Sequence, residues 1–198
     1  MLFSHRKVLC TMIGLGAAMA MAGEDAHYTN VEMSWAGNGS TTGAFRNGVS
    51  LNGSKLFSDS LFAVASVLAT NGDRRTGVDS YFGAVGVGMR HELTGDMDLV
   101  TALTLNVRVN YANATGNGSA SQDGGALHIG LRSWPLPELE LSAGSRYANF
   151  GRSLHDVTWS AGARYYFTDK LATGFDVNRD NDGTVWKVAL RWDFGDFY

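Results

Sequence analysis

Hydrophobic and polar residues alternate along the stretch from Thr184 to Phe194. One parity holds Trp186, Val188, Leu190, Trp192 and Phe194, and the other holds Lys187, Ala189, Arg191 and Asp193. A period of two is the signature of a β-strand whose two faces meet different surroundings. The stretch is therefore predicted to be a strand with one aromatic and aliphatic face and one charged face.

Similar segments recur along the chain and predict ten β-strands. Their approximate bounds are 29–36, 44–55, 61–70, 80–92, 98–111, 124–133, 139–149, 157–167, 171–178 and 184–194. Five loops rich in Gly, Asn, Ser and Asp (37–42, 71–79, 112–123, 150–156 and 179–183) alternate with four tight turns (57–60, 93–97, 134–138 and 168–170). This alternation is typical of an all-β, up-and-down antiparallel transmembrane β-barrel. We predict ten strands, with eight as the alternative.

The start of the chain has the features of a secretory leader. His5, Arg6 and Lys7 precede a largely apolar run that ends in small residues. A charged head, an apolar middle and an A-x-A end predict a cleaved signal peptide. We expect residues 1–22 to be this signal, with cleavage after Ala20 as the alternative to Ala22, and residues 23–198 to form one barrel domain.

Loss of the leader changes the composition of the remaining chain. The single cysteine, Cys10, would leave with the leader, so disulfides could not hold the fold. The net charge would become more negative than −3, which argues against nucleic acid as a partner. No later segment approaches the roughly 18 apolar residues of a spanning helix, so a membrane location would require strands.

The alternation also predicts which side chains face lipid. In segment 157–167 the outward parity would hold Val157, Trp159, Ala161, Ala163, Tyr165 and Phe167. Segment 61–70 does not sort, because Phe62 and Val64 lie on the parity opposite Leu61, and its register stays open. A soluble barrel with the reverse sidedness is the alternative.

Aromatic residues gather near the strand ends, as in the two girdles of a membrane barrel. The loop-side set is Trp35, Tyr81, Tyr111, Trp159 and Trp186, and the turn-side set is Phe57, Trp134, Tyr165, Phe167, Trp192 and Phe194. So many rings would not fit inside a ten-stranded barrel. The girdles therefore favour the membrane barrel over the soluble one.

The inward parity carries charges of both signs. The predicted lumen network comprises Glu32, Arg46, Arg90, Glu92, Arg108, Arg132, Glu140, Arg146, Arg164, Asp176, Lys187, Arg191 and Asp193. Unpaired arginines in a narrow lumen would be costly, so a hydrogen-bonded polar plug is expected. An anion-selective pore lined by the same arginines is the alternative. Glycines on this parity, such as Gly162 and Gly174, would make room for the arginines.

No set of residues assembles into a catalytic, cofactor or metal site. The histidines His27, His91, His128 and His155 lie in separate segments, and none follows a nucleophile-elbow pattern. The run from Asn178 to Gly183 resembles half of a calcium loop, but Ala189 stands where the bidentate acid is needed. We expect a non-enzymatic barrel with structural or surface-interaction roles. The alternatives are a narrow porin-like channel or small-ligand transporter and, less favoured, a lipid-modifying enzyme.

Three short runs resemble a known family. They are Gly86-Val87-Gly88 with the following His91-Glu92-Leu93 and Asp98-Leu99-Val100-Thr101, Arg164-Tyr165-Tyr166-Phe167-Thr168-Asp169, and Leu190-Arg191-Trp192-Asp193-Phe194. The pattern resembles small single-domain outer-membrane β-barrels of Gram-negative bacteria, some once described as secreted immune elicitors or quorum signals. The resemblance implies an outer-membrane location, and it brings no catalytic residues.

The end of the last strand predicts how the barrel is assembled. Trp192, Phe194 and Tyr198 are the candidate C-terminal signal for the barrel-assembly machinery, and Phe194 is favoured as its last residue because Gly195 is a poor strand residue. The expected partners are outer-membrane lipid and that machinery, with an unidentified extracellular ligand at the loops. We expect a monomer.

Overall fold

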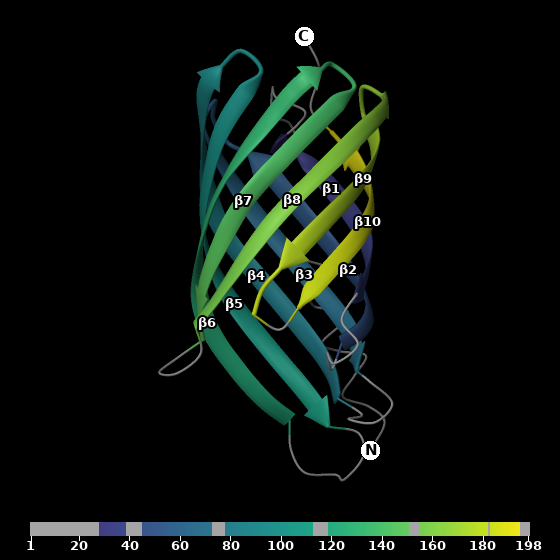
Figure 1. The fold of residues 1–198 in the computed structure, drawn as a ribbon. Coiled ribbons are helices and arrows are strands. Elements are labelled where there is room, and N and C mark those ends of the chain that lie inside the picture. The colour runs from purple at the N-terminus through teal and green to yellow at the C-terminus, as the bar shows by residue number, and fades with distance from the viewer. Residues whose placement is uncertain are drawn as a thin grey trace.

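The computed structural model is a closed barrel of ten antiparallel strands (Figure 1). The strands are β1 Asn30–Asn38, β2 Phe45–Leu56, β3 Leu61–Gly72, β4 Val78–Thr94, β5 Met97–Ala112, β6 Ser119–Leu136, β7 Leu139–Asn149, β8 His155–Thr168, β9 Leu171–Arg179 and β10 Thr184–Asp193. The structure describes residues 28–38, 45–72, 78–112, 119–150, 155–181 and 183–194. Each strand pairs with the next, which confirms the ten-stranded up-and-down topology.

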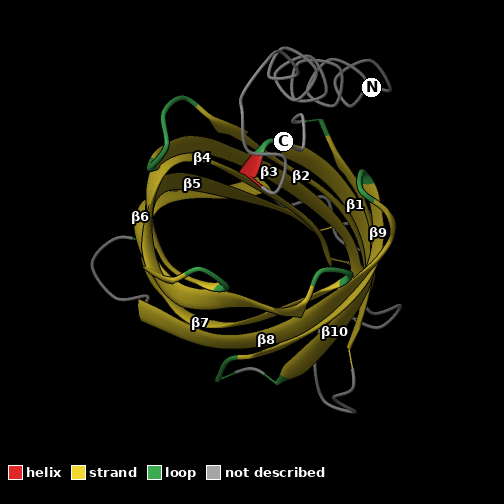
Figure 2. Ribbon diagram, turned by 90° about the horizontal axis from the view of Figure 1, so that it is seen from above, coloured by secondary structure: helices red, strands yellow, loops and turns green. Residues whose placement is uncertain are grey.

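The barrel closes where the first strand meets the last, and the view from above shows the closed ring of strands (Figure 2). The register runs from Asn30 opposite Asp193 to Asn38 opposite Val185. One further bond extends the seam, because the Phe194 N–H donates to the Thr29 carbonyl at 2.8 Å. Closure leaves no open strand edge along the seam, which a hydrocarbon environment requires.

Large hydrophobic side chains cover the outside of the barrel. Leu105 is 73% exposed, and the exposed set also includes Val87, Leu103, Ile129, Val157, Trp159, Tyr165, Phe167, Leu190 and Trp192. Water would penalise such a belt, whereas lipid would not. The predicted sidedness is therefore confirmed. No helix in the described part of the chain is long and apolar enough to cross a membrane.

The prediction that Trp134 belongs to the turn-side girdle is wrong. Trp134 packs against the buried cluster of Tyr28, Leu56 and Phe62, and the Arg132 guanidinium lies 5.1 Å from its ring centroid. The pairing of β6 with β7 shifts register between Ser133 and Leu136. The strand continues through this irregularity where a turn was predicted, and Trp134 keeps the inward parity of Arg132.

Strands β4, β5 and β6 are longer than the sequence predicted. Residues 112–123 were expected to form a loop, but β6 begins at Ser119, opposite Tyr111 of β5. The polar residues from Ser119 to Asp123, which were predicted to lie in a loop, instead extend the pairing of β5 with β6. At the end of the barrel opposite the four tight turns, β5 and β6 reach further than β9 and β10 (Figure 1).

The open register of β3 is settled by the structure. Phe62 is buried and Leu61 is exposed, so Phe62 and Val64 face the lumen. Their partners across the β3–β4 ladder are Gly88 and Gly86. A Cβ at Gly88 would collide with the Phe62 ring, so this glycine makes room for an aromatic side chain. The predicted room for arginine is found at Gly174, whose Cβ would lie 3.0 Å from Cγ of Arg164.

Candidate functional site in the barrel lumen

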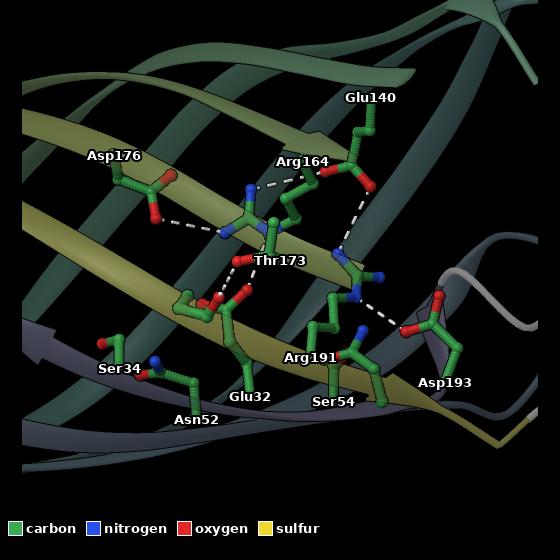
Figure 3. A network of polar contacts seen from close by, with 12 residues as sticks. Glu32, Ser34, Asn52, Ser54, Glu140, Arg164, Thr173, Asp176, Arg191 and Asp193 are labelled. Carbon is green, nitrogen blue, oxygen red and sulfur yellow. Dashed lines mark hydrogen bonds and ion pairs between the residues drawn. The ribbon is translucent and has the colours of Figure 1, made fainter. Parts of the chain in front are cut away.

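A buried network of charges lines one wall of the lumen, and Arg164 of β8 lies at its centre (Figure 3). Its Nε donates to Glu32 of β1 at 2.7 Å, and its Nη2 donates to Asp176 of β9 at 3.4 Å. Its Nη1 lies 3.5 Å from Glu140 of β7. Strands from both sides of the barrel seam are thereby joined through one side chain.

Glu140 is the second centre of this network and is only 1% exposed. It accepts hydrogen bonds from Arg132 at 2.6 and 3.3 Å, from Nη1 of Arg191 at 3.3 Å and from the Tyr166 hydroxyl at 3.2 Å. Arg191 also donates to Asp193 at 2.7 Å. Three arginines therefore share one carboxylate, which has exchanged water for charge-assisted bonds.

An aromatic residue crosses the lumen at the turn end. Tyr28, just before β1, is 2% exposed, and its hydroxyl donates to Asp98 of β5 at 2.7 Å. Its ring lies 5.4 Å from that of Phe62 of β3. Guanidinium groups lie over it, at 4.4 Å for Arg132 of β6 and 5.0 Å for Arg90 of β4. We call these five residues the Tyr28 layer.

A second aromatic layer lies toward the loop end. Phe150, which follows β7, is buried, and its ring centroid is 6.4 Å from that of Phe82 on β4. Arg108 of β5 lies 5.1 Å from the Phe150 ring, and Arg146 of β7 lies 5.4 Å from Phe82 and 5.9 Å from Phe150. We call these four residues the Phe150 layer. It joins β7 to β4 and β5 through the interior.

The lumen also contains a cavity of about 380 Å³. Its charged wall carries the side chains of Glu32, Glu140, Arg132, Arg146, Arg164 and Arg191. The opposite wall, from β3, β4 and β5, is largely apolar and includes Phe62, Val64, Phe82, Ala84, Val100 and Ala102. The predicted polar network therefore occupies one wall of the cavity. The other wall is apolar, because β3 directs hydrophobic side chains into the lumen.

The predicted lumen residues do not all join the network. Arg90 and Arg108 face inward but contact aromatic rings. Glu92 is exposed at the end of β4 and stands apart from the buried carboxylates. Lys187 lies opposite Asp176 in the β9–β10 register but forms no ion pair with any residue the structure describes. The Arg46 side chain lies outside the described part.

Two of the three predicted assembly residues lie on the outer surface of the barrel. Trp192 and Phe194 are exposed on the turn side, with their rings stacked at 5.8 Å and an interplanar angle of 4°. Tyr198 lies outside the described residues. Phe194 also extends the β1–β10 seam, because its N–H donates to the Thr29 carbonyl. Its side chain and its backbone therefore both contribute to the end of the seam.

The described residues include no group of three or more His, Cys, Asp or Glu side chains placed to hold a metal ion. In the run that resembled a calcium loop, Gly183 has a φ of 148° and its N–H donates to Oδ1 of Asp180 at 2.9 Å. Gly tolerates this φ, as a hairpin connection needs. His128 and His155 contact Thr104 and Tyr147, respectively.

Sequence reasoning missed the residues that cross the lumen. Tyr28 precedes the first strand and Phe150 was assigned to a loop, so neither carried a strand-parity signal. The one available signal was the anomaly in β3, where Phe62 and Val64 broke the sorting. An apolar side chain on the inward parity of a membrane barrel needs an apolar partner inside, and Tyr28 supplies one.

The chain is similar to several solved barrels at low sequence identity. No family model and no curated protein matches the chain. A KdgM porin is 12% identical, covers 85% of this chain and 99% of its own, and has a TM-score of 0.49. Neisserial surface protein A is 13% identical, covers 84% of this chain and 96% of its own, and has a TM-score of 0.47. The COG4313 outer membrane channel from Pseudomonas putida F1 is 10% identical, covers 89% of this chain and 98% of its own, and has a TM-score of 0.48.

The closed ten-stranded ladder and the apolar exterior define the class of the chain without these likenesses. The chain is a β-barrel of the transmembrane type with a charged network inside.

Proposed function

We propose that this protein is a non-enzymatic outer-membrane barrel that does not conduct ions and that acts in a structural or interaction role at the cell surface. The observation that carries the proposal is the pair of layers across the lumen. Tyr28 contacts β3, β4, β5 and β6 from its position before β1, and Phe150 contacts β4 and β5 from the end of β7.

The energetics of the layers support a closed lumen. An ion crossing the barrel would need a continuous path of water past Tyr28, whose ring is enclosed by Phe62, Arg90 and Arg132. Opening that path would break the hydrogen bond to Asp98 and the cation–π contacts, each worth about 0.5–2 kcal/mol in partly desolvated sites. The ion pairs of the charged network also hold together the strands of the adjacent lumen wall.

We expect the purified barrel to give no stable unitary conductance in planar bilayers. Replacing Tyr28 and Phe150 together by Ala should produce conductance steps, because both layers would lose the ring that fills them. Tyr147→Ala is the control, since this ring is exposed on the outer surface. Stable steps from the unmodified barrel, rising further in Arg108→Ser or Arg164→Ser, would instead establish the narrow porin-like channel.

The channel or small-ligand transporter is the second candidate function. It is favoured by the lumen cavity, which shows that the network and the two layers do not fill the interior. A lipid-modifying enzyme receives no comparable support from the described residues. Of the pair that could carry such chemistry, His155 stacks on Tyr147 and Asp156 lies near Arg146.

The extended strands supply a surface for interaction. Between Ser119 and Gly124, β6 pairs with β5, and among the described residues its ladder with β7 begins at Gly125 opposite Asn149. We call residues 119–124 of β6 and their partners on β5 the ridge. If the four tight turns face the periplasm, the ridge projects from the cell surface. Export through a Sec-type leader at residues 1–22 and insertion by the barrel-assembly machinery complete the proposal.

Single-cysteine variants test this orientation, because Cys10 in the predicted leader is the chain's only cysteine. Ser121→Cys, at an exposed site on the ridge, should react with a membrane-impermeant maleimide on intact cells. Asp169→Cys, in the β8–β9 turn, should react only after the outer membrane is permeabilised. The reverse labelling pattern, or equal labelling at both sites, would contradict the proposed orientation.

A further inference from the structure

We propose that the lumen cavity is a binding site for a small amphipathic carboxylate, with Arg146 pairing with its anionic group and the wall of β3, β4 and β5 receiving its apolar body. The inference goes beyond the surface role, which needs no ligand in the lumen.

Arg146 differs from the other arginines that border the cavity. Arg132, Arg164 and Arg191 each donate hydrogen bonds to buried carboxylates. Arg146 forms no hydrogen bond with any residue that the structure describes, and its Nη2 is buried without a partner. Its one ion pair, to the partly exposed Asp156, is long at 3.9 Å. This guanidinium therefore retains donors for an anion inside the cavity.

A neutral donor, Asn106, lines the same cavity as Arg146. His128 stands directly opposite Arg146 in the β6–β7 register, and its Nε2–H donates to the Thr104 hydroxyl at 3.2 Å, because the Thr104 proton is donated to Asn106. Asn106 is 1% exposed, its Oδ1 accepts from Thr104 at 3.1 Å, and its Nδ2 is buried without a partner. Buried donors left unpaired are costly, and a bound acceptor would remove that cost.

The described lining of the cavity carries more positive than negative side chains, and Arg164 and Arg191 are in addition paired with Asp176 and Asp193, which do not line it. The lining holds four arginines and two glutamates, Glu32 and Glu140, and both glutamates are already bonded to arginines other than Arg146. One guanidinium with a neutral donor suits a planar monoanion, which it can bind in a bidentate way. A carboxylate fits this set better than a dianionic phosphate, which would need further cations.

The apolar wall determines the rest of the ligand. Phe82 borders the cavity and lies 5.4 Å from the Arg146 guanidinium, so the charged and apolar parts of the site adjoin. Val64, Ala84, Val100 and Ala102 continue this wall. A volume of about 380 Å³ falls within the range of small-molecule sites, about 300–1,000 Å³. A carboxylate with one aromatic ring or a short aliphatic chain matches both the size and the polarity.

The site can be tested with 4-fluorophenylacetate as the probe and the refolded barrel in detergent micelles. Fluorine NMR should show saturable broadening of the probe signal with the unmodified barrel and none with empty micelles. The neutral 4-fluorophenylacetamide has nearly the same shape, and we expect it to bind at least tenfold more weakly because it cannot form the ion pair.

Three variants make the test specific. Arg146→Gln should weaken binding of the acid at least tenfold, and Ala102→Phe should block it by filling the apolar side of the cavity. Arg179→Gln removes the same charge at an exposed site at the end of β9 and should leave binding unchanged. Heat-modifiable gel migration verifies that each variant is folded. No saturable binding, equal binding of acid and amide, or unchanged affinity in both Arg146→Gln and Ala102→Phe would overturn the proposal.

Discussion

Replacing Glu140 by Gln is expected to lower the free energy of unfolding of the barrel by about 3–5 kcal/mol, the cost of breaking a buried ion pair by removing one partner. Arg132, Arg164 and Arg191 would lose the carboxylate that they share. An amide can accept hydrogen bonds, but it carries no charge and also adds two donors, which would point toward these cations. Urea titration of the refolded barrel in detergent micelles measures the change.

Glu138→Gln is the matched control for this prediction. Glu138 is exposed in the turn before β7, two residues from Glu140, so its substitution should change the free energy of unfolding by less than about 0.5 kcal/mol. Equal effects of the two substitutions would show that the shared carboxylate does not stabilise the barrel. Glu140→Gln with unchanged stability would lead to the same conclusion.

Phe194→Asp is expected to remove most of the folded barrel from the outer membrane. The Phe194 side chain is exposed on the lipid-facing surface and stacks on Trp192, while its N–H bonds to Thr29. A carboxylate at this position would meet the membrane interface, and the charge would disrupt the aromatic end that the assembly machinery is proposed to recognise. Immunoblotting of membrane fractions, with and without heating, measures the folded amount.

Deleting Phe197 and Tyr198 is the control for the position of the signal. Both residues lie beyond the seam bond of Phe194 and outside the described residues. We expect this deletion to leave the folded amount unchanged. Loss of folded barrel on deletion, with Phe194→Asp tolerated, would assign the signal to the true C-terminus. Leader cleavage should be normal in both variants, because the change lies at the other end of the chain.

The alternation of side chains was sufficient to predict the strands, because the parity of a β-strand is a local property. Strand β7 was predicted with its observed bounds, and β8 and β10 to within two residues. The outward face of β8 was predicted correctly, including Trp159 and Tyr165. Prediction failed where polar residues extend a hairpin, as at Ser119, since a polar strand beyond the lipid has the composition of a loop.

The inward parity placed the charged residues of the Arg164 and Glu140 network on the lumen side, but it missed Asp98 and could not pair the others. Glu32 and Arg164 are 132 residues apart and lie on strands separated by β9 and β10. Their contact depends on strand tilt, register and side-chain length, which no local pattern records. The same holds for Glu92, whose parity matched the network but whose position at the end of β4 leaves it exposed.

The barrel, its lipid-facing surface and most charged residues of its interior could therefore be predicted from the alternation alone, because each follows from a period of two repeated along the chain. The residues that fill the lumen depend on tertiary contacts. Tyr28 and Phe150 lie in connecting segments, and they enter the lumen because closure brings β3, β4 and β5 within reach. The unpaired donors of Arg146 are likewise a result of closure, since a residue's lack of a partner is defined only once all ten strands are in place.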